Sequence, residues 1–323
     1  MRFRGREQRI GGAAWTGPVA NQERANLKAK MSTITILGAG GKMGCRLTDK
    51  LAKTEHRLFL VEVSEPGKAN LAGRGWSITP RAEALAQSEV VILALPDRVL
   101  GQVAHEVVPE LRAGTLVVAL DPAVAHAGGL PERADISYFV THPCHPNLFD
   151  HFETEAERDD FFGGAHARQA IVCALMQGPE EHYQVGENLA RQFFGPVTRA
   201  HRITVEQMAI LEPAMAETCG IALVMALREA LEEAVRRGVP RAAAEDFMFG
   251  HVNVELGIGF GRAPFPFSDG AKLIAGYGQR RIFRDDWLRL FDPASVKEQV
   301  KMIVAGSVPE PATPPSAAEQ RLS

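Results

Sequence analysis

The chain is poor in cysteine, carries little net charge and has no long hydrophobic run. Its 4 cysteines are scattered without paired spacing and no secretory signal precedes them, which excludes a disulfide framework and indicates a reducing cytoplasm. A formal net charge of -3 excludes the basic surface that binds nucleic acid. Because no apolar stretch reaches the length that crosses a bilayer, we expect no membrane partner. Small molecules remain as the expected partners.

Both ends of the chain lack the pattern of a folded domain. Residues 1–30 hold arginine, glycine and alanine without a strand pattern, and Met31 stands directly before the first expected strand. We therefore expect 1–30 to be a disordered leader or an over-extended start. Residues 307–323 are rich in Pro, Ala and Ser, which predicts a disordered tail. The folded region is predicted to span 31–306, which is long enough for two domains.

The region 31–148 alternates short apolar runs with helical patterns, which is typical of βα units and a parallel sheet. Expected strands lie at 33–37, 58–63, 90–95, 115–120 and 136–141. From 149 to 306, one strand-like run at 169–176 precedes helical periodicity, including a long amphipathic helix at 204–237 that Pro213 kinks or interrupts. The predicted fold class is α/β, with a Rossmann-type parallel-sheet domain at 31–148 and a mostly α-helical substrate and dimerisation domain at 149–306.

A glycine cluster follows the first expected strand, and it predicts a dinucleotide site. Glycines let the backbone approach a pyrophosphate, while the helix N-terminus offers free N–H groups. The spacing departs from G-x-G-x-x-G, because Met43 fills the sixth position. Glu62 lies 24 positions after Gly38, where an acid accepts hydrogen bonds from the ribose of NAD and repels the 2′-phosphate of NADP. The predicted NAD-binding residues are Gly38, Ala39, Gly40, Gly41, Lys42, Met43, Gly44, Glu62, Leu95, Pro96 and Asp97.

Two histidines follow the fifth expected strand, in the run His142-Pro143-Cys144-His145-Pro146. Ligands of open α/β sheets bind beyond the carboxyl ends of the strands, so these imidazoles are candidates for metal ligation or for acid/base work beside a nicotinamide. The alternative is that the prolines shape a crossover and the histidines are spectators. We expect Cys144 to pack against its neighbours and not to act as a nucleophile.

Two further pairs of side chains could join these histidines. Glu212 and Glu217 lie on the apolar helix at 204–237, where acids are rare unless they are paired or bind a cation. His251 and Glu255 are four residues apart and share a helix face. A mixed nitrogen and oxygen set suits zinc or a related metal, and carboxylates alone suit magnesium. The alternative for each pair is a set of surface groups on a helix.

The glycine turn at Gly38 to Gly44, the histidine loop and the helix with Glu212 and Glu217 together resemble bacterial NAD-binding proteins with a phosphogluconate-dehydrogenase-like C-terminal domain. The likeness covers about 31–306. It implies NAD-dependent oxidation of a branched sugar acid at its 2-hydroxyl, followed by an α-ketol shift. A homodimer that pairs through the helix at 204–237 is implied as well.

The resemblance also implies roles for individual residues. His142, His145 and Glu217 would be catalytic, with a histidine as the base that takes the hydroxyl proton. A divalent metal ion, zinc or magnesium, would be held by His142, His145, Glu212 and Glu217 and would stabilise the alkoxide charge of the shift. Two alternatives stay open at this point: a hydroxyacid dehydrogenase, decarboxylating or not, that performs no rearrangement, and a non-catalytic NAD-sensing protein.

Overall fold

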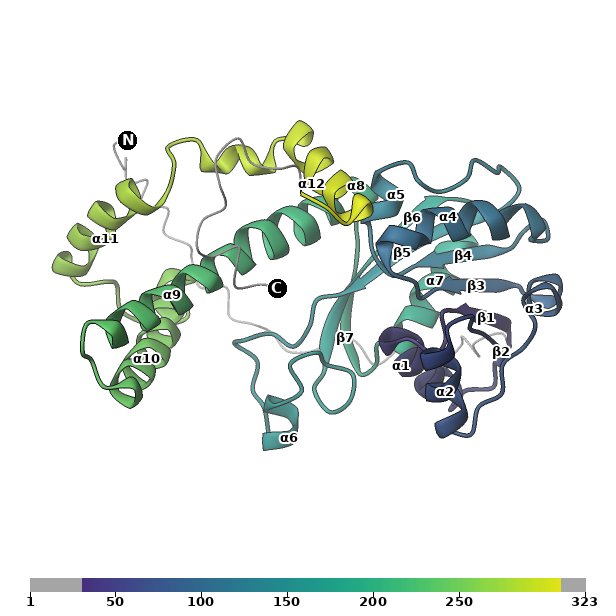
Figure 1. Cartoon of the computed structure of the whole chain (residues 1–323), viewed down its shortest axis with the longest axis horizontal. Coiled ribbons are helices and arrows are strands. Elements are labelled where there is room, and N and C mark those ends of the chain that lie inside the picture. The colour runs from purple at the N-terminus through teal and green to yellow at the C-terminus, as the bar shows by residue number, and fades with distance from the viewer. Residues whose placement is uncertain (1–30, 309–323) are drawn as a thin grey trace. The chain divides into compact units, whose positions relative to one another are not determined.

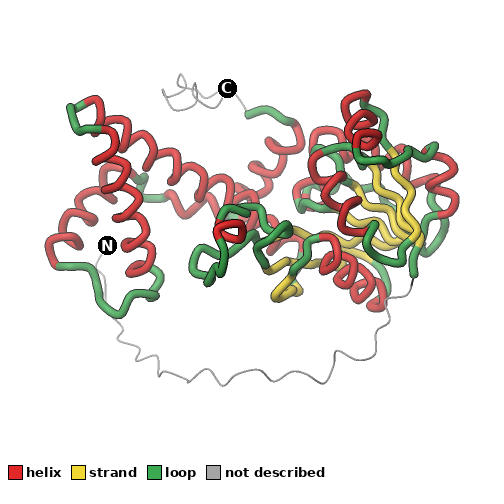
Figure 2. The backbone as a smooth tube through the Cα atoms, turned by 90° about the horizontal axis from the view of Figure 1, so that it is seen from below, coloured by secondary structure: helices red, strands yellow, loops and turns green. Residues whose placement is uncertain are grey.

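The computed structural model describes residues 31–308 and contains a seven-stranded sheet between helices (Figures 1 and 2). The prediction of disorder for 1–30 lies outside the described residues, and so does that for 307–323 except at Ser307 and Val308. The strand order is β2-β1-β3-β4-β5-β6-β7, and all neighbours are parallel except β5 and β6. The strands are β1 (Thr33–Leu37), β2 (Arg57–Val61), β3 (Val90–Leu93), β4 (Leu116–Ala119), β5 (Ser137–Pro143), β6 (Gln169–Gln177) and β7 (Val197–Arg202).

Helices cover both faces of this sheet, and the predicted α/β fold class is confirmed. Strands β3 and β4 are buried along their whole length, because a parallel sheet with helices on both sides hides both faces of each strand. One face carries α3 (Arg81–Gln87), α4 (Asp97–Val107), α5 (Ala123–His126) and α8 (Val205–Ala209). The other face carries α1 (Lys42–Leu51), α2 (Glu65–Gly73) and α7 (Glu180–Phe193).

The sheet continues beyond residue 148, because β6 and β7 extend it past β5. Strand β6 matches the strand-like run expected at 169–176, whereas β7 has no counterpart among the expected strands. Strand β7 reads VTRAHR and is an edge strand that is exposed or half-buried at every position. Such a strand needs no apolar alternation, so periodicity gives no signal for it.

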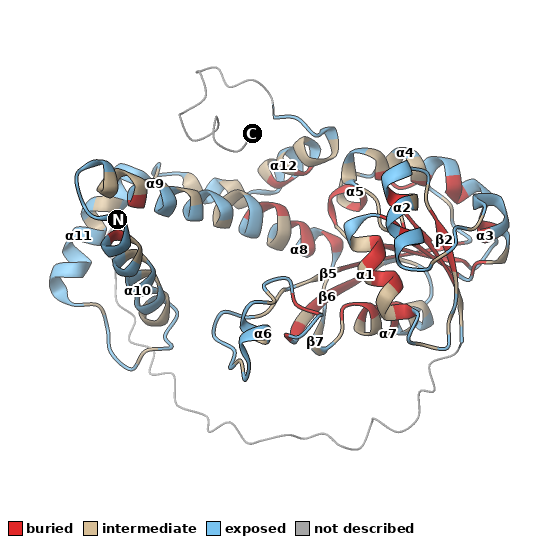
Figure 3. Ribbon diagram, turned by 60° about the horizontal axis from the view of Figure 1, so that its bottom comes forward, coloured by how far each residue is buried: buried red, intermediate tan, exposed pale blue. Residues whose placement is uncertain are grey.

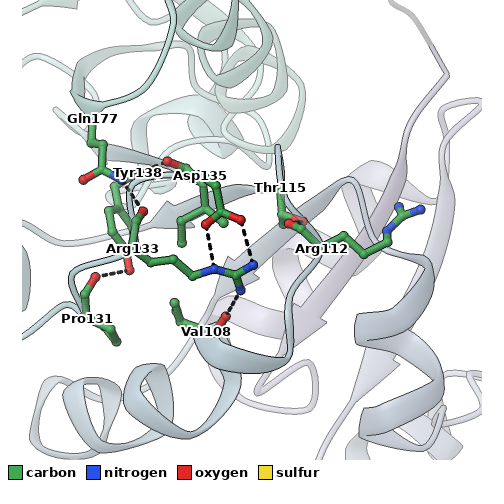
Figure 4. Close-up of polar contacts among 9 residues, drawn as sticks. Val108, Arg112, Thr115, Pro131, Arg133, Asp135, Tyr138 and Gln177 are labelled. Atoms are coloured by element: carbon green, nitrogen blue, oxygen red, sulfur yellow. Dashed lines mark hydrogen bonds and ion pairs between the residues drawn. The ribbon is translucent and has the colours of Figure 1, made fainter.

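Side-chain hydrogen bonds fix the segment that enters β5 (Figure 4). The Arg133 guanidinium donates to the Asp135 carboxylate and to the Val108 carbonyl. The Gln177 amide at the end of β6 donates to the Arg133 carbonyl, 2.7 Å away. This network holds the amino end of β5, so that the strand carries His142 at its other end in a defined position.

A continuous helix runs from Val205 to Arg236 through α8, a π-helical segment at Ile210–Ile221 and α9 (Ala222–Arg236). We expected Pro213 to kink or interrupt it. Because proline has no N–H, the wider π-helical turn accommodates the missing i→i−4 hydrogen bond at this point. By length and composition this helix could cross a membrane, with a mean hydropathy of 1.6 in its most apolar window, and this corrects our statement that no stretch is long enough.

The remaining α-helices are α6 (Glu155–Arg158), α10 (Arg241–Gly259), α11 (Asp269–Ile282) and α12 (Pro293–Ala305), and two short 3₁₀ helices lie at Val108–Glu110 and Trp287–Phe291. Figure 3 shows that exposed and half-buried residues dominate α9, α10 and α11. Within them only Leu231 and Ala244 are buried. In contrast, α12 packs against α4, α5 and the π-helical segment through Val296 and Val300. Helix α12 thereby fastens the π-helical segment to the sheet domain.

Candidate active site

A pocket of about 500 Å³ lies where β1, β3, β4 and β5 end. It includes the switch point of the sheet, since the chain leaves β1 toward β2 on one side and β3 pairs on the other. The π-helical segment closes one side of it through Glu212. Of the predicted site residues, Gly41, Lys42, Met43, Leu95, Pro96, Asp97, His142, His145 and Glu212 line this pocket.

Three glycines shape the turn between β1 and α1. Gly38 has φ 77°, and a Cβ atom there would lie 2.4 Å from the Ala94 carbonyl oxygen. A Cβ on Gly40 would lie 2.1 Å from the Gly67 carbonyl oxygen, and one on Gly44 2.1 Å from that of Gly38. Gly40 therefore serves the packing of α2 as well as the turn.

The first turn of α1 has no acidic residue and no side-chain cap. No acidic side chain of α1 itself therefore occupies the N–H groups and the positive end of the dipole at its start, which suits a pyrophosphate.

Glu62 ties the end of β2 to this glycine turn. Its Oε2 accepts from the Gly40 N–H at 3.0 Å, and its Oε1 accepts from the N–H groups of Val63 and Ser64 at 2.9 and 2.8 Å. The backbone N–H groups therefore fix the carboxylate in one place, where the hydroxyl groups of a ribose could donate hydrogen bonds to it as well. Its contact with the ribose of a cofactor stays a prediction.

His142 stands at the end of β5 with one defined tautomer. Its Nδ1 lies 3.0 Å from the Leu120 carbonyl oxygen, and because a carbonyl only accepts, Nδ1 carries the proton and Nε2 keeps a free lone pair. Burial lowers the pKa of His142 to about 4, so the imidazole is neutral at physiological pH. The Asp121 carboxylate lies 3.9 Å from Nδ1. His142 therefore offers an unprotonated ring nitrogen that can accept a proton.

His145 is the single non-glycine residue with a positive φ, 60°, in the described range 31–308. Its Nδ1 lies 3.1 Å from the Phe162 carbonyl oxygen, so Nδ1 carries a proton and donates it to this acceptor. The ring centroids of His142 and His145 are 6.2 Å apart, with the rings nearly perpendicular. Residues in sparsely populated backbone regions gather at functional sites, and this one lines the pocket beside His142.

Four carboxyl groups gather at the π-helical side of the pocket. Burial, together with the nearby charges of Asp121, Glu217 and Asp97, raises the pKa of Glu212 to about 8. Burial also raises the pKa of Asp97 and of Asp121 to about 6 each, and raises that of Glu217. Within residues 31–308 none of these four acids forms an ion pair with a lysine or an arginine, so the group holds protons that isolated carboxyls would release.

The π-helical segment explains how two of these acids meet. Glu212 and Glu217 are five residues apart and would point to different faces of an α-helix, which has 3.6 residues per turn. The i→i+5 pattern of a π-helix brings them onto one side, and their carboxyl groups share a hydrogen bond.

A metal site is not preformed in this arrangement. Within residues 31–308, no group of three or more His, Cys, Asp or Glu side chains is placed to hold a metal ion. The donor chemistry nevertheless fits a cation, because the repulsion that raises these carboxyl pKa values is what a divalent ion relieves. The alternative pair His251 and Glu255 lies on α10 away from the pocket, where His251 stacks on Phe247 with centroids 3.8 Å apart.

Several pocket residues were missed by the sequence reasoning. Asp121 lines the pocket two residues after the end of β4 and was not among the predicted site residues, whereas Asp97, four residues after the end of β3, was. Arg46 and Lys50 line the pocket from α1, one and two turns after Lys42, a spacing that helical periodicity could have shown. Phe162 comes from the loop between β5 and β6, and no local pattern marks it.

Cys144 as a whole residue is exposed. The protein around its thiol group nevertheless excludes part of the solvent, which raises the pKa of the thiol. That shift opposes thiolate formation, so this cysteine lacks the property of a nucleophile.

Comparison with known proteins identifies relatives of the whole described region. The family model for the C-terminal domain of decarboxylating phosphogluconate dehydrogenase matches residues 150–304, and that for coenzyme F420-dependent NADP oxidoreductase matches residues 33–121. The D-apionate oxidoisomerase of Cupriavidus necator is 46% identical over 272 residues, which cover 84% of this chain and 98% of that protein. The D-apionate oxidoisomerase of Rhizobium rhizogenes is 46% identical over 274 residues, covering 84% and 100%.

Among solved structures, a semialdehyde dehydrogenase NAD-binding protein from Cupriavidus necator, in complex with calcium and NAD, superimposes with a TM-score of 0.83. It is 45% identical, and the match covers 84% of this chain and 99% of that one.

Proposed function

The chain belongs to the D-apionate oxidoisomerase family, and we propose that it oxidises D-apionate with NAD at the 2-hydroxyl and rearranges the product to 3-oxo-isoapionate. In the oxidation, carbon 2 loses a hydride and its hydroxyl loses a proton, which leaves a 2-oxo acid beside a tertiary alcohol. In the α-ketol shift, a hydroxymethyl group migrates from carbon 3 to carbon 2, and the ketone moves to carbon 3. One substrate thus yields one rearranged keto acid, NADH and a proton.

The observation that carries this proposal is the free Nε2 of a neutral His142 in the pocket. Removal of the 2-hydroxyl proton needs an acceptor that is unprotonated at neutral pH and fixed in one tautomer. The Leu120 carbonyl supplies the fixed tautomer, and burial supplies the low pKa. His145 offers a second imidazole in the same pocket for this role.

The acids serve the rearrangement in this proposal. During the shift, the tertiary hydroxyl loses a proton and the oxygen on carbon 2 gains one. Glu212, whose pKa is raised to about 8, holds a proton at neutral pH that it can give to the oxygen on carbon 2. Glu217 shares a hydrogen bond with Glu212, so it can take the proton of the tertiary hydroxyl and pass it on to Glu212. The pair thereby forms a proton reservoir at the reacting end of the pocket.

The cofactor and a metal ion supply what these side chains cannot. When bound, NAD supplies a hydride acceptor and a divalent cation supplies a Lewis acid for neighbouring oxygens. Support for NAD in place of NADP comes from Glu62, which the glycine turn holds at the end of β2. For the cation, we assign the carboxylates of Glu212 and Glu217 from among the four predicted ligands, so that Nε2 of His142 stays available for the hydroxyl proton. The clustered carboxylates favour magnesium over zinc in this set, because hard cations prefer oxygen ligands.

We also propose a cytoplasmic homodimer that covers the exposed helices α9 to α11. Phe247 and Ile274 are each 67% exposed, and Leu273 is 74% exposed. Apolar patches of this kind mark association surfaces, and a second copy would bury them without a lipid phase. Ile274→Glu should yield monomers in sedimentation experiments, whereas Ile78→Glu on the nucleotide-binding side should leave the dimer intact. A wild-type protein that sediments as a monomer, or with membranes, contradicts this assembly.

Turnover of D-apionate tests the proposed activity directly. The purified protein with D-apionate and NAD should produce NADH, and His142→Asn should abolish most of that rate. His251→Asn is the matched control, because His251 is exposed on α10 outside the pocket. If the wild-type protein forms no NADH from D-apionate, the proposal fails; if it forms NADH but an unrearranged 2-oxo acid, the protein is a simple hydroxyacid dehydrogenase.

A further inference from the structure

Phe162 lies between the cofactor-binding helix and the histidine loop, in the loop that joins β5 and β6. Lys42 Nζ lies 4.3 Å from the centroid of its ring, and the Arg46 guanidinium carbon lies 5.2 Å from it. Both cations belong to α1, which begins directly after the glycine turn. Cations at this distance from an aromatic ring are attracted by its quadrupole. The ring therefore restrains two long side chains of the helix that follows the glycine turn.

The same residue also holds His145. The Phe162 carbonyl accepts the Nδ1–H of His145 at 3.1 Å, and the two rings meet edge to face with centroids 5.3 Å apart. The neighbouring Gly163 carbonyl accepts from Arg46 at 2.9 Å. One short segment thus contacts α1 on one side and the imidazole on the other.

The exposure of Phe162 indicates that the residue serves these contacts and not the packing of the core. Its side chain is 48% exposed, so it contributes little to the core of the protein. An aromatic ring in such a position keeps its place through the two cations and the imidazole that surround it.

We infer that Phe162 is a positioning residue that couples NAD binding to the orientation of His145. The inference rests on the proposed function for the identity of the ligand. The ring holds Lys42 and Arg46 beside the glycine turn before the cofactor arrives, so less side-chain freedom is lost when the pyrophosphate binds. The same loop position keeps the Phe162 carbonyl in place for His145. The loop segment with Phe162 therefore determines both how Lys42 and Arg46 meet the cofactor and which tautomer His145 adopts.

Phe161 provides a matched control on the same loop. It is 80% exposed, and within residues 31–308 it takes part in none of the ring or cation contacts that Phe162 makes. The variants Phe162→Leu, Phe162→Tyr and Phe161→Leu separate loss of the aromatic face from loss of apolar bulk, because leucine keeps the bulk and tyrosine keeps the ring.

The test measures NADH binding by fluorescence and the His145 imidazole by nitrogen NMR, neither of which requires substrate. Phe162→Leu should weaken NADH binding about ten-fold, while Phe162→Tyr and Phe161→Leu stay within about two-fold of the wild type. Phe162→Leu should also give a mixture of His145 tautomers, and Phe162→Tyr should restore the single one. In turnover, the KM for NAD should rise more than kcat falls.

The inference is overturned if Phe162→Leu binds NADH like the wild type, or if Phe161→Leu loses as much affinity. An unchanged His145 tautomer in Phe162→Leu overturns the coupling. Failure of D-apionate turnover with these binding results intact would instead contradict the proposed function alone.

Discussion

Glu212 and Glu217 share a hydrogen bond across the π-helical segment, which two carboxyl groups form only while one of them holds a proton. Burial and the charges of Asp121 and Asp97 keep that proton in place. The pocket therefore stores protons at a pH where ordinary carboxylates have lost them, and several consequences can be measured.

The pH dependence of stability should report this proton. The pKa of Glu212 rises from 4.5 to about 8 on folding, so between these values unfolding releases a proton and becomes more favourable as the pH rises. We expect the difference in Tm between Glu212→Gln and the wild type to grow in favour of the variant by about 3 °C or more from pH 5 to pH 8. Above pH 8 the difference should level off. Calorimetry across this range measures it.

Glu255→Gln is the control for that experiment, because Glu255 is an exposed acid on α10 outside the pocket. Its Tm should follow the wild type at every pH. Parallel curves for Glu212→Gln and the wild type would show that Glu212 ionises normally and would remove the proton reservoir from the mechanism.

The pH profile of turnover should distinguish His142 from an ordinary histidine. Because burial lowers its pKa to about 4, the acid limb of kcat/KM that belongs to His142 should lie well below pH 6. His142→Asn should lower kcat by about 100-fold to 10,000-fold, since asparagine cannot take the proton. Full activity in this variant, or an acid limb at the ordinary histidine pKa, would assign the base elsewhere.

Divalent cations should act through the same carboxyl cluster. Magnesium or calcium held by Glu212 and Glu217 would relieve their repulsion, so the cation should raise the Tm at pH 8. At one hundred times its Kd, a cation that binds only the folded protein adds about 2.7 kcal/mol to the free energy of unfolding. Glu212→Gln should abolish most of that shift, whereas Glu255→Gln should keep it. The cation assignment is contradicted if the Tm of the wild type stays unchanged when either ion is present at roughly 100 times a Kd in the millimolar range.

The glycine turn offers a test of the cofactor site that does not involve the acids. Gly40→Ala would place a Cβ atom 2.1 Å from the Gly67 carbonyl oxygen, so α2 must move. We expect a loss of about 1–3 kcal/mol in stability, together with weaker NADH binding. Gly73→Ala in the same helix meets no atom within 4 Å and should be neutral or slightly stabilising. If the two substitutions change stability and NADH binding equally, the close packing of Gly40 against α2 does not determine either property.

The sequence predicts the strands, the glycine turn and the polar residues after the strands, because each of these features depends on residues that are close together in the chain. The run Thr33–Leu37, the glycine turn and the acids or histidines after β3 and β5 follow from apolar strands that end at one edge of a sheet. The predicted first strand agrees with β1 at both ends.

The remainder depends on contacts between distant segments. The π-helical segment that pairs Glu212 with Glu217 arises around Pro213, and a proline alone predicts a break as readily as a wider turn. Phe162 reaches the pocket through a loop that has no periodicity, 120 positions after Lys42. The pKa shift of Glu212 depends on Asp97, the first residue of α4, and on Asp121 in the loop between β4 and α5. None of these relations is written in a local pattern.

The product formed from D-apionate labelled with carbon-13 at position 3 tests the proposed oxidoisomerase activity most directly. With NAD and the wild-type protein, the labelled carbon should change in the NMR spectrum from a tertiary alcohol to a ketone, with one NADH formed per molecule, because the hydroxymethyl group has left it for carbon 2. A labelled carbon that remains a tertiary alcohol beside a new 2-oxo group, at the same yield of NADH, would contradict the rearrangement.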